Sequence, residues 1–301
     1  MAIHLARQFG GEVINADSRQ VYVGMDIGTA KPTAEEQAAA RHYLIDICSP
    51  ATPFSLGEFI PLAVKTISEI AGRGQLPILC GGTGQYVWAL LEGWDVPSVL
   101  PDAEFRKAME QRARAEGVQA LWLELQEVDP VRAEEIGPNN LRRLIRALEI
   151  RRNSNGAMAT NGKATSPPYN VLIIGLEADR ADLYRRIDDR VDWMMANGLL
   201  DEARRLAAEG YTLGEGPLSG VGYDQLGQYL SNNMTLDEAV AQTKTRTHRL
   251  VRRQNTWFKR GDQRITWLDT TGRDPAEPAA AAVREFLESS GACGTIGRDS
   301  G

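Results

Sequence analysis

Four consecutive polar residues near the start of the chain could do acid–base chemistry. Asp17, Ser18, Arg19 and Gln20 come directly after residues 11–14, a short apolar segment that reads as a buried strand. In an open parallel sheet, ligands bind beyond the carboxyl ends of the strands. The run therefore offers proton acceptors and donors to a polar substrate. The spacing alone also fits a strand exit in which Asp17 and Ser18 satisfy local backbone groups.

A second candidate, Thr83, lies in a glycine-rich turn. Residues 76–80 read as another buried strand, Gly81-Gly82-Thr83-Gly84 breaks it, and a helix is expected over residues 86–91. A strand, a glycine turn and a helix in this order let a substrate approach backbone N–H groups closely. Because Thr83 follows the carboxyl end of a strand, as Asp17 does, we expect a second substrate contact there.

Two clusters of basic residues could bind phosphate groups. The net charge of the chain is −6, but local positive patches matter more for phosphate binding than the total charge does. A solvated helix face would explain such runs equally well. The first cluster, residues 244–260, has no acidic residue, and the second contains only Glu149. They comprise Lys244, Arg246, Arg249, Arg252, Arg253, Lys259 and Arg260, and Arg142, Arg143, Arg146, Arg151 and Arg152.

Arg186 and Arg190 form a further candidate phosphate site. They are spaced i, i+4 in a predicted helix, so they share one face and could hold a phosphate together. They could also pair with Asp182, Asp189 or Glu202, and the residues alone favour that pairing.

Composition places the chain among soluble globular proteins. It has 301 residues, of which 43% are hydrophobic and 25% charged, and no apolar run is long enough to span a bilayer. The first nine residues are too short and amphipathic for a secretory signal. Three scattered cysteines argue against a disulfide framework or a metal site. We therefore expect a cytoplasmic protein.

The order of predicted elements indicates an α/β fold with a parallel sheet and an inserted helical lobe. Capping boxes at Thr33, Ser55 and Thr235 predict helix starts. We further expect a strand over residues 44–48, a flexible loop over 153–168, and one long helical stretch over 180–208. The predicted domains are residues 1–96, the first part of the α/β domain; 97–168, a helical insertion; 169–272, the return to the α/β domain with a basic C-terminal helix; and 273–301, a partly disordered tail.

The first residues read as the end of a helix. Residues 2–9 are helical in pattern, and Gly10-Gly11 stops them. A doubly wound domain does not usually begin within a helix, because its first strand and phosphate-binding glycine turn come earlier. We therefore expect that the first strand and the P-loop are absent from this chain, and that Met1 is a truncation or a misplaced start.

Several blocks of consecutive residues form distinctive sequence motifs. They are DSRQVY at 17–22, GMDIGTAKP at 24–32, LIDI at 44–47, LPILCGGTG at 76–84, VGY at 221–223 and RRQNTWF at 252–258. Together they resemble the signature of the tRNA dimethylallyltransferases, or tRNA isopentenyltransferases, over about residues 1–270.

The resemblance implies a P-loop NTPase-like fold, with helices on both faces of a parallel sheet, and a transferase activity. A dimethylallyl group would pass from its diphosphate to the exocyclic N6 amine of the adenosine 3′ to the anticodon. Asp17 matches the family's proposed base, and Thr83 matches a threonine near the reacting centre. Arg190 matches an arginine on the diphosphate. The implied cofactor is Mg²⁺ held mainly through the substrate diphosphate, so no protein metal cluster is expected.

The resemblance implies two partners, the tRNA anticodon stem-loop and dimethylallyl diphosphate, and no association with a membrane. We expect a monomer. The target base must leave its stack to reach the pocket. Asp224 departs from the family, which commonly has a lysine or arginine there. The residues that match tRNA contacts are Asp17, Ser18, Arg19, Gln20, Arg106, Arg142, Arg143, Leu144, Ile145, Arg146, Ser219, Gly220, Val221, Gly222, Tyr223 and Asp224, and the basic segment adds Arg252 and Arg253.

Two other functions remain open at this stage. A small-molecule kinase-like enzyme would share the sheet and a phosphate loop, but it would not need two distant arginine clusters. A non-catalytic tRNA-binding remnant of the family would keep the clusters and lack the P-loop.

Overall fold

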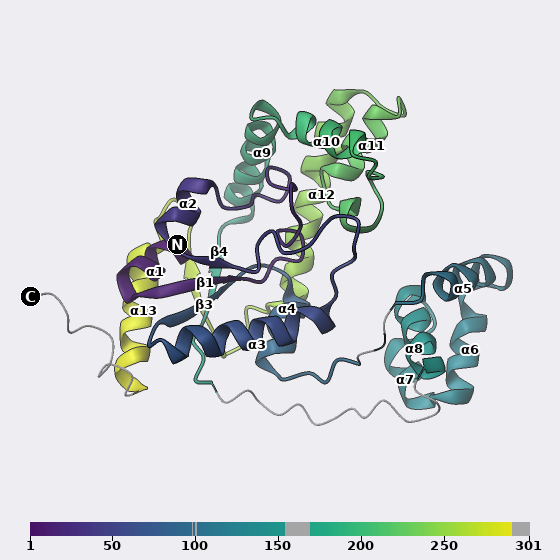
Figure 1. The fold of residues 1–301 in the computed structure, drawn as a ribbon, viewed down its shortest axis with the longest axis horizontal. Helices are drawn as coiled ribbons and strands as arrows, with labels where there is room; N and C mark the ends of the chain where they lie inside the picture. Colours follow the sequence, from purple (N-terminus) through teal and green to yellow (C-terminus); the bar gives the residue numbers. More distant parts are fainter. Residues whose placement is uncertain (98, 100, 154–168, 291–301) are drawn as a thin grey trace, which may run out of the picture. The chain divides into compact units, whose positions relative to one another are not determined.

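A computed structural model describes residues 1–97, 99, 101–153 and 169–290 (Figure 1). The chain divides into two compact units, which are described separately. The first comprises Met1–Leu91 with Pro167–Gly301, and the second comprises Glu92–Ser166. The predicted flexible loop lies, except for Asn153, outside the described residues, and so does the tail after residue 290.

The first unit contains two parallel sheets, as the predicted α/β class requires. One has the strand order β2-β1-β3, and the other pairs β4 with β5. Parallel strands need long crossover connections, and helices supply most of them here. The strands are β1 (Gly11–Asn15), β2 (His42–Tyr43), β3 (Leu76–Cys80), β4 (Ile173–Glu177) and β5 (Ile265–Asp269).

Helices cover both faces of the first sheet, because adjacent residues of β1 point to opposite sides. Val13 packs in one cluster with Ala6, whereas Ile14 packs in another with Phe59 and Tyr86. The rings of Phe59 and Tyr86 stack with centroids 4.1 Å apart. The helices concerned are α1 (Ala2–Phe9) on one face, and α3 (Leu56–Gly72) and α4 (Gly84–Leu91) on the other.

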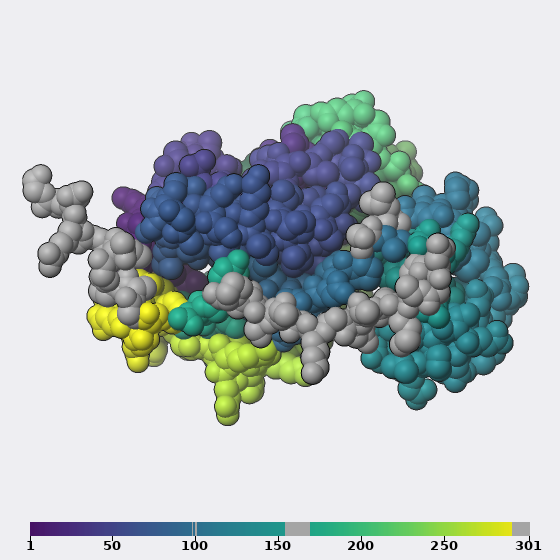
Figure 2. Space-filling model, turned by 60° about the horizontal axis from the view of Figure 1, so that its bottom comes forward, coloured from purple at the N-terminus to yellow at the C-terminus, as the bar shows by residue number. Residues whose placement is uncertain are grey.

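A common helical layer joins the two sheets. Residues of β3, β4 and β5 pack in one apolar cluster with α1 and with α13 (Ala276–Ser289). In the view of Figure 2, α13 (yellow) and α3 (blue) both lie at the surface of this unit. Within the described residues, β3 pairs only with β1 and β4 only with β5, so each has one unpaired edge. Leu176 in β4 is 47% exposed, which is unusual for a parallel sheet.

The three predicted capping boxes are confirmed. Thr33, Ser55 and Thr235 each accept a hydrogen bond from the backbone three residues later, and a glutamate there bonds back to the cap. These caps start α2 (Ala34–Ala39), α3 and α12 (Leu236–Trp257), which is the long basic helix.

Two predicted elements are wrong in detail. The strand expected over residues 44–48 is not formed, because Leu44 and Asp46 have φ values of 61° and 54°, which a strand cannot continue. Only a short parallel bridge between Tyr22 and Cys48 remains there. The helical stretch over 180–208 is two helices, since Gly198 has φ 103°. They are α9 (Arg180–Ala196) and α10 (Leu199–Ala208).

The loop after β1 packs on the C-terminal helices. Val21 and Met25 are fully buried in one cluster with Leu199, Leu206 and Tyr223. This core fixes the loop that continues from the polar run at Asp17. The same core contains residues of the short 3₁₀ helix η1 (Gly216–Ser219) and of α11 (Tyr223–Leu230).

The second unit is helical in its described residues. Leu121, Leu125 and Leu144 are fully buried and form its core. Leu144, Ile145 and Leu148 of the last helix pack in this core. The helices are α5 (Ala103–Glu116), α6 (Val118–Val128), α7 (Pro130–Ile136) and α8 (Leu141–Asn153). In neither unit is a described helix both long and apolar enough to cross a membrane.

Candidate active site

Asp17 and Thr83 come together at the carboxyl edge of the first sheet. The pairing of Asn15 with Cys80 sets the residues after β1 beside the residues after β3. The Thr83 N–H donates to the Ala16 carbonyl at 3.2 Å, and the Ser18 N–H donates to Thr83 Oγ1 at 2.9 Å. Thr83 Oγ1 in turn donates to Ser18 Oγ at 3.2 Å. The structure thus joins the two candidate residues in one hydrogen-bonded turn.

The Asp17 carboxyl is oriented by its own turn and has an altered pKa. The Arg19 N–H donates to Asp17 Oδ1 at 2.7 Å, and the Asp17 N–H donates to Asn15 Oδ1 at 2.9 Å. Burial raises the pKa of Asp17, and it outweighs the backbone hydrogen bonds of Arg19 and Gln20, which lower it. A carboxylate with a raised pKa is a better proton acceptor than an ordinary aspartate.

Asn15 supports this turn, a role that no sequence pattern indicates beyond the position of the residue after a strand. Its Nδ2 donates to the carbonyls of Leu44, at 2.9 Å, and Asp17, at 3.0 Å. The side chain is buried, so each of these bonds replaces a hydrogen bond to water.

The glycines around Thr83 are required by the protein's own packing. A Cβ on Gly81 would lie 2.3 Å from the Ala16 backbone, and one on Gly84 would lie 2.3 Å from Trp257. A Cβ on Gly82 would lie 2.2 Å from Gln254 Nε2. Neighbouring residues therefore occupy the Cβ side of these three glycines, and the approach of a substrate to the backbone N–H groups of the turn stays a prediction.

Arg19 connects the polar run to the segment before α11. Its Nη1 donates to the Pro217 carbonyl at 2.5 Å, and its Nη2 approaches Ser219 Oγ at 3.4 Å. Gly220 lies against the same side chain. Three residues that match tRNA contacts, Arg19, Ser219 and Gly220, thus form one surface, although some 200 residues separate them in the chain.

Glu202 of α10 holds the loop after the polar run. Its carboxylate accepts hydrogen bonds from the N–H groups of Asp26 and Ile27, both at 2.9 Å, and of Gly28 at 3.0 Å. It also accepts one of 2.7 Å from the Tyr223 hydroxyl. Glu202 is only 7% exposed. The sequence pattern indicated Glu202 only as a possible ion-pair partner for Arg186 or Arg190.

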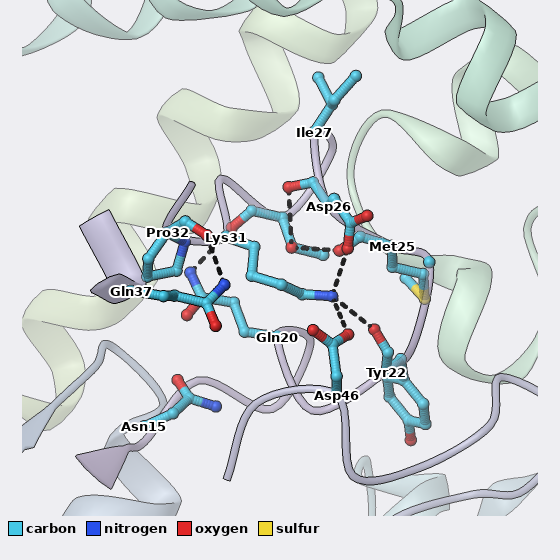
Figure 3. A network of polar contacts seen from close by, with 12 residues as sticks. Asn15, Gln20, Tyr22, Met25, Asp26, Ile27, Lys31, Pro32, Gln37 and Asp46 are labelled. Carbon is cyan, nitrogen blue, oxygen red and sulfur yellow. Dashed lines mark hydrogen bonds and ion pairs between the residues drawn. The ribbon is translucent and has the colours of Figure 1, made fainter. Parts of the chain in front are cut away.

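Lys31 fixes the other end of the same loop (Figure 3). Its Nζ donates to the Tyr22 carbonyl at 2.8 Å and forms ion pairs of 2.5 Å with Asp26 and Asp46. The Lys31 side chain is 3% exposed. Such a buried cation is stable only because it is paired and fully hydrogen-bonded.

The Gln20 amide is partly committed to this loop. Its Nε2 donates to the carbonyls of Thr29, at 3.2 Å, and Ala30, at 3.1 Å. A contact between Gln20 and RNA would therefore use the side-chain oxygen.

Tyr223, Gly222 and Asp224 are held within the protein, and their predicted contacts with RNA stay predictions. Tyr223 and Gly222 are buried, and burial together with the Glu202 carboxylate raises the pKa of Tyr223. Asp224 forms an ion pair of 2.6 Å with Arg246. The acidic residue at this position thus neutralises a cation of α12. Val221 is only partly buried.

The two arginines of α9 have different environments. Arg186 forms an ion pair of 2.7 Å with Asp182 and approaches Thr270, so pairing within the protein holds for this residue. Arg190 is exposed and has no hydrogen bond or ion pair to any residue that the structure describes. Its predicted contact with a diphosphate stays a prediction.

Part of the basic helix α12 is used within the protein. Lys244 pairs with Asp192 at 2.7 Å, and Arg260, just after the helix, pairs with Glu177 at 2.8 Å. Arg249, Arg252 and Arg253 are exposed, and their guanidinium groups have no polar partner among the described residues. These three arginines are available to a phosphate backbone.

In the second unit, Glu149 engages two of the predicted tRNA-binding residues. Arg106 donates to it twice, at 2.9 and 2.7 Å, and Arg146 donates once, at 2.5 Å. Burial alone would raise the pKa of Glu149, but these hydrogen bonds outweigh it and lower the pKa to about 2.

The remaining residues of that cluster divide by exposure. Leu144 and Ile145 are buried in the helical core, and their predicted contact with RNA stays a prediction. Arg142 and Arg143 are exposed. Residues 142–146 therefore lie partly in the core and partly on the surface.

A family model described as IPP transferase matches residues 20–261, most of the chain and most of the site described above. The chain belongs to the tRNA dimethylallyltransferase family. The tRNA dimethylallyltransferase of Roseiflexus sp. is 46% identical over 288 residues, covering 96% of this chain and 94% of that protein. The one from Thermomicrobium roseum is 47% identical over 270 residues, covering 90% and 82%.

Solved structures of tRNA prenyltransferases have the same fold. The tRNA isopentenylpyrophosphate transferase of Bacillus halodurans is 41% identical, with a TM-score of 0.70 over 96% of this chain and 92% of that one. A eukaryotic dimethylallyltransferase acting on tRNA is 26% identical, with a TM-score of 0.81 over 96% of this chain and 76% of that one. The P-loop NTPase-like α/β class predicted from the sequence is therefore confirmed.

Proposed function

We propose that this tRNA dimethylallyltransferase transfers a dimethylallyl group from dimethylallyl diphosphate to the N6 amine of the adenosine 3′ to the anticodon. The amine nitrogen forms a bond to C1 of the allyl group, and the C1–O bond breaks. The diphosphate leaves with the electron pair of that bond, and the amine loses one proton.

Asp17 is the proposed acceptor of that proton. The observation that carries the proposal is the joining of Asp17 and Thr83 through Ser18 at the edge of a parallel sheet, where ligands of such folds bind. The raised pKa of Asp17 suits a general base, whose contribution to rate is typically about 10²–10⁴-fold.

Thr83 and Arg190 are the proposed contacts of the leaving group. The Thr83 hydroxyl can redirect its hydrogen from Ser18 to the bridging oxygen as negative charge develops there. Arg190 has the free guanidinium that a diphosphate needs.

Mg²⁺ is the proposed cofactor, held mainly by the diphosphate oxygens. No group of three or more His, Cys, Asp or Glu side chains suited to a metal occurs in the described residues. An ion that arrives with the substrate would neutralise phosphate charge.

The anticodon stem-loop is the proposed RNA ligand. Arg19 with Ser219 and Gly220 offers one polar surface, and Arg249, Arg252 and Arg253 offer charge for the phosphate backbone. We further propose that the protein works as a cytoplasmic monomer.

Single-turnover transfer of radiolabelled dimethylallyl to an anticodon stem-loop tests the proposal. Asp17→Asn is expected to lower the rate about 10²-fold or more, with a small change in RNA affinity. Asp237→Asn, an exposed position on α12, is the matched control and should retain the wild-type rate. Equal rates in wild type and Asp17→Asn would remove Asp17 from the mechanism.

A further inference from the structure

The carboxyl end of α12 packs directly on the turn that carries Thr83. Gln254 Nε2 donates to the Gly82 carbonyl at 3.2 Å, a contact between residues 172 positions apart. Trp257 fills the space beside Gly84. Figure 1 shows this end of α12 next to α4, the helix that begins in the same turn.

The turn is enclosed from two sides. Ala16 closes it from the β1 side, through the hydrogen bond from the Thr83 N–H and the close approach to Gly81. Gln254 and Trp257 close it from the α12 side. Gly81, Gly82 and Gly84 have no positive φ, so these glycines are needed for space and not for backbone conformation.

The tryptophan side of this contact is itself anchored. Trp88 Nε1 of α4 donates to the Trp257 carbonyl at 2.9 Å, and the Arg264 guanidinium lies 4.2 Å from the centre of the Trp88 ring. The end of α12 is therefore held against α4, and Gln254 is held at the turn.

The same helix carries the exposed arginines. Arg253 immediately precedes Gln254, and neither its guanidinium nor that of Arg252 has a polar partner within the described residues. The same helix thus presents cations to solvent and, at the next residue, a hydrogen bond to the turn of Thr83.

We infer that Gln254 is a positioning residue that couples RNA binding on α12 to the alignment of the Thr83 hydroxyl. Phosphates bound at Arg252 and Arg253 would restrict the motion of the end of the helix. The hydrogen bond from Gln254 would then restrict the motion of the Gly82 carbonyl and of the turn. The catalytic part of this inference rests on the proposed transferase function; the coupling part does not.

Single-turnover rates and RNA affinities test the catalytic part. Gln254→Met keeps the length of the side chain and removes the donor, and Gln254→Glu replaces the donor with an acceptor. Both are expected to lower the transfer rate about 10-fold or more, because small misplacements of reacting groups are costly, while the Kd for RNA stays within about twofold. Gln242→Ala, an exposed glutamine on the same helix, should match wild type.

Hydrogen exchange tests the coupling without any turnover. In wild type, a bound anticodon stem-loop is expected to slow amide exchange over residues 82–87. In Gln254→Met the RNA should bind with the same affinity and leave exchange in this segment unchanged. Equal slowing in both proteins would overturn the coupling. An inactive wild type that still shows the coupling would count against the proposed transferase function alone.

A double-mutant cycle separates positioning from general stability. Gly82→Ala places a methyl group 2.2 Å from Gln254 Nε2, so it should lower the transfer rate in wild type. In Gln254→Ala the space is free, and the same change should cost much less, because contacting residues are not additive. Additive losses would show that Gln254 does not act on this turn.

Discussion

The Tyr223 hydroxyl donates a hydrogen bond of 2.7 Å to the carboxylate of Glu202, which also holds three backbone N–H groups of the loop after the polar run. This one buried carboxylate joins α10, α11 and the loop at residues 26–28. A Cβ on Gly28 would lie 2.6 Å from the Tyr223 ring, so loop and ring are in close contact. The tyrosine of the VGY block, Tyr223, therefore supports the loop at residues 26–28.

Glu202→Gln is expected to destabilise the protein and weaken RNA binding together. The amide of glutamine has one acceptor oxygen, and its NH₂ would face N–H donors. Each buried group left without a partner costs about 1–3 kcal/mol. Denaturant unfolding and RNA titration measure the two effects. Tyr223→Phe, which removes a single donor and leaves the loop bonds in place, should have the smaller effect on both.

Asp17→Asn is expected to stabilise the fold while it removes activity. Burial raises the folded-state pKa of Asp17, so the charged form is disfavoured in the folded protein relative to the unfolded chain. The carboxylate therefore opposes folding at pH values above that pKa, and wild type recovers this stability as the pH falls and the group is protonated.

Thermal unfolding of both proteins across pH measures this effect. At pH 7 the Tm of Asp17→Asn should exceed that of wild type, and the difference should shrink as the pH falls. A lower Tm for the variant at pH 7 would contradict the raised pKa.

Replacing Arg252 and Arg253 together with alanine is expected to weaken binding of every RNA. These side chains are exposed and without protein partners in the described structure, so their loss should remove phosphate contacts. The slope of log K against log salt should fall by about 2. Arg204→Ala, whose arginine pairs with Asp201 on α10, serves as control. An unchanged slope would make the basic helix an ordinary solvated surface.

Glu149→Gln is expected to destabilise the helical unit in a pH-dependent manner. The folded-state pKa of Glu149 is about 2, below its ordinary value of 4.5, because Arg106 and Arg146 donate hydrogen bonds to it. Its contribution is therefore complete above pH 4.5 and is lost as the pH falls towards 2. Unfolding of both proteins across this range should show wild type losing its advantage at the acidic end. A constant difference would contradict this account.

The sequence alone determined the features that depend on local pattern. The caps at Thr33, Ser55 and Thr235 follow from side chains that bond their own helix, and they form as predicted. The placement of Asp17 and Thr83 at one edge follows from their positions after strands, because parallel strands end on the same side. The family was recognisable from blocks of consecutive residues.

Only the tertiary structure decided which distant residues meet. Gln254 with Gly82, Glu202 with Gly28 and Arg19 with Pro217 are contacts across 172, 174 and 198 positions. Nothing in a local pattern specifies such pairs, since they depend on how helices pack against the sheet. The same packing decided that Leu144 is core while Arg143 beside it is exposed, and that Gly82 and Gly84 make room for side chains of α12.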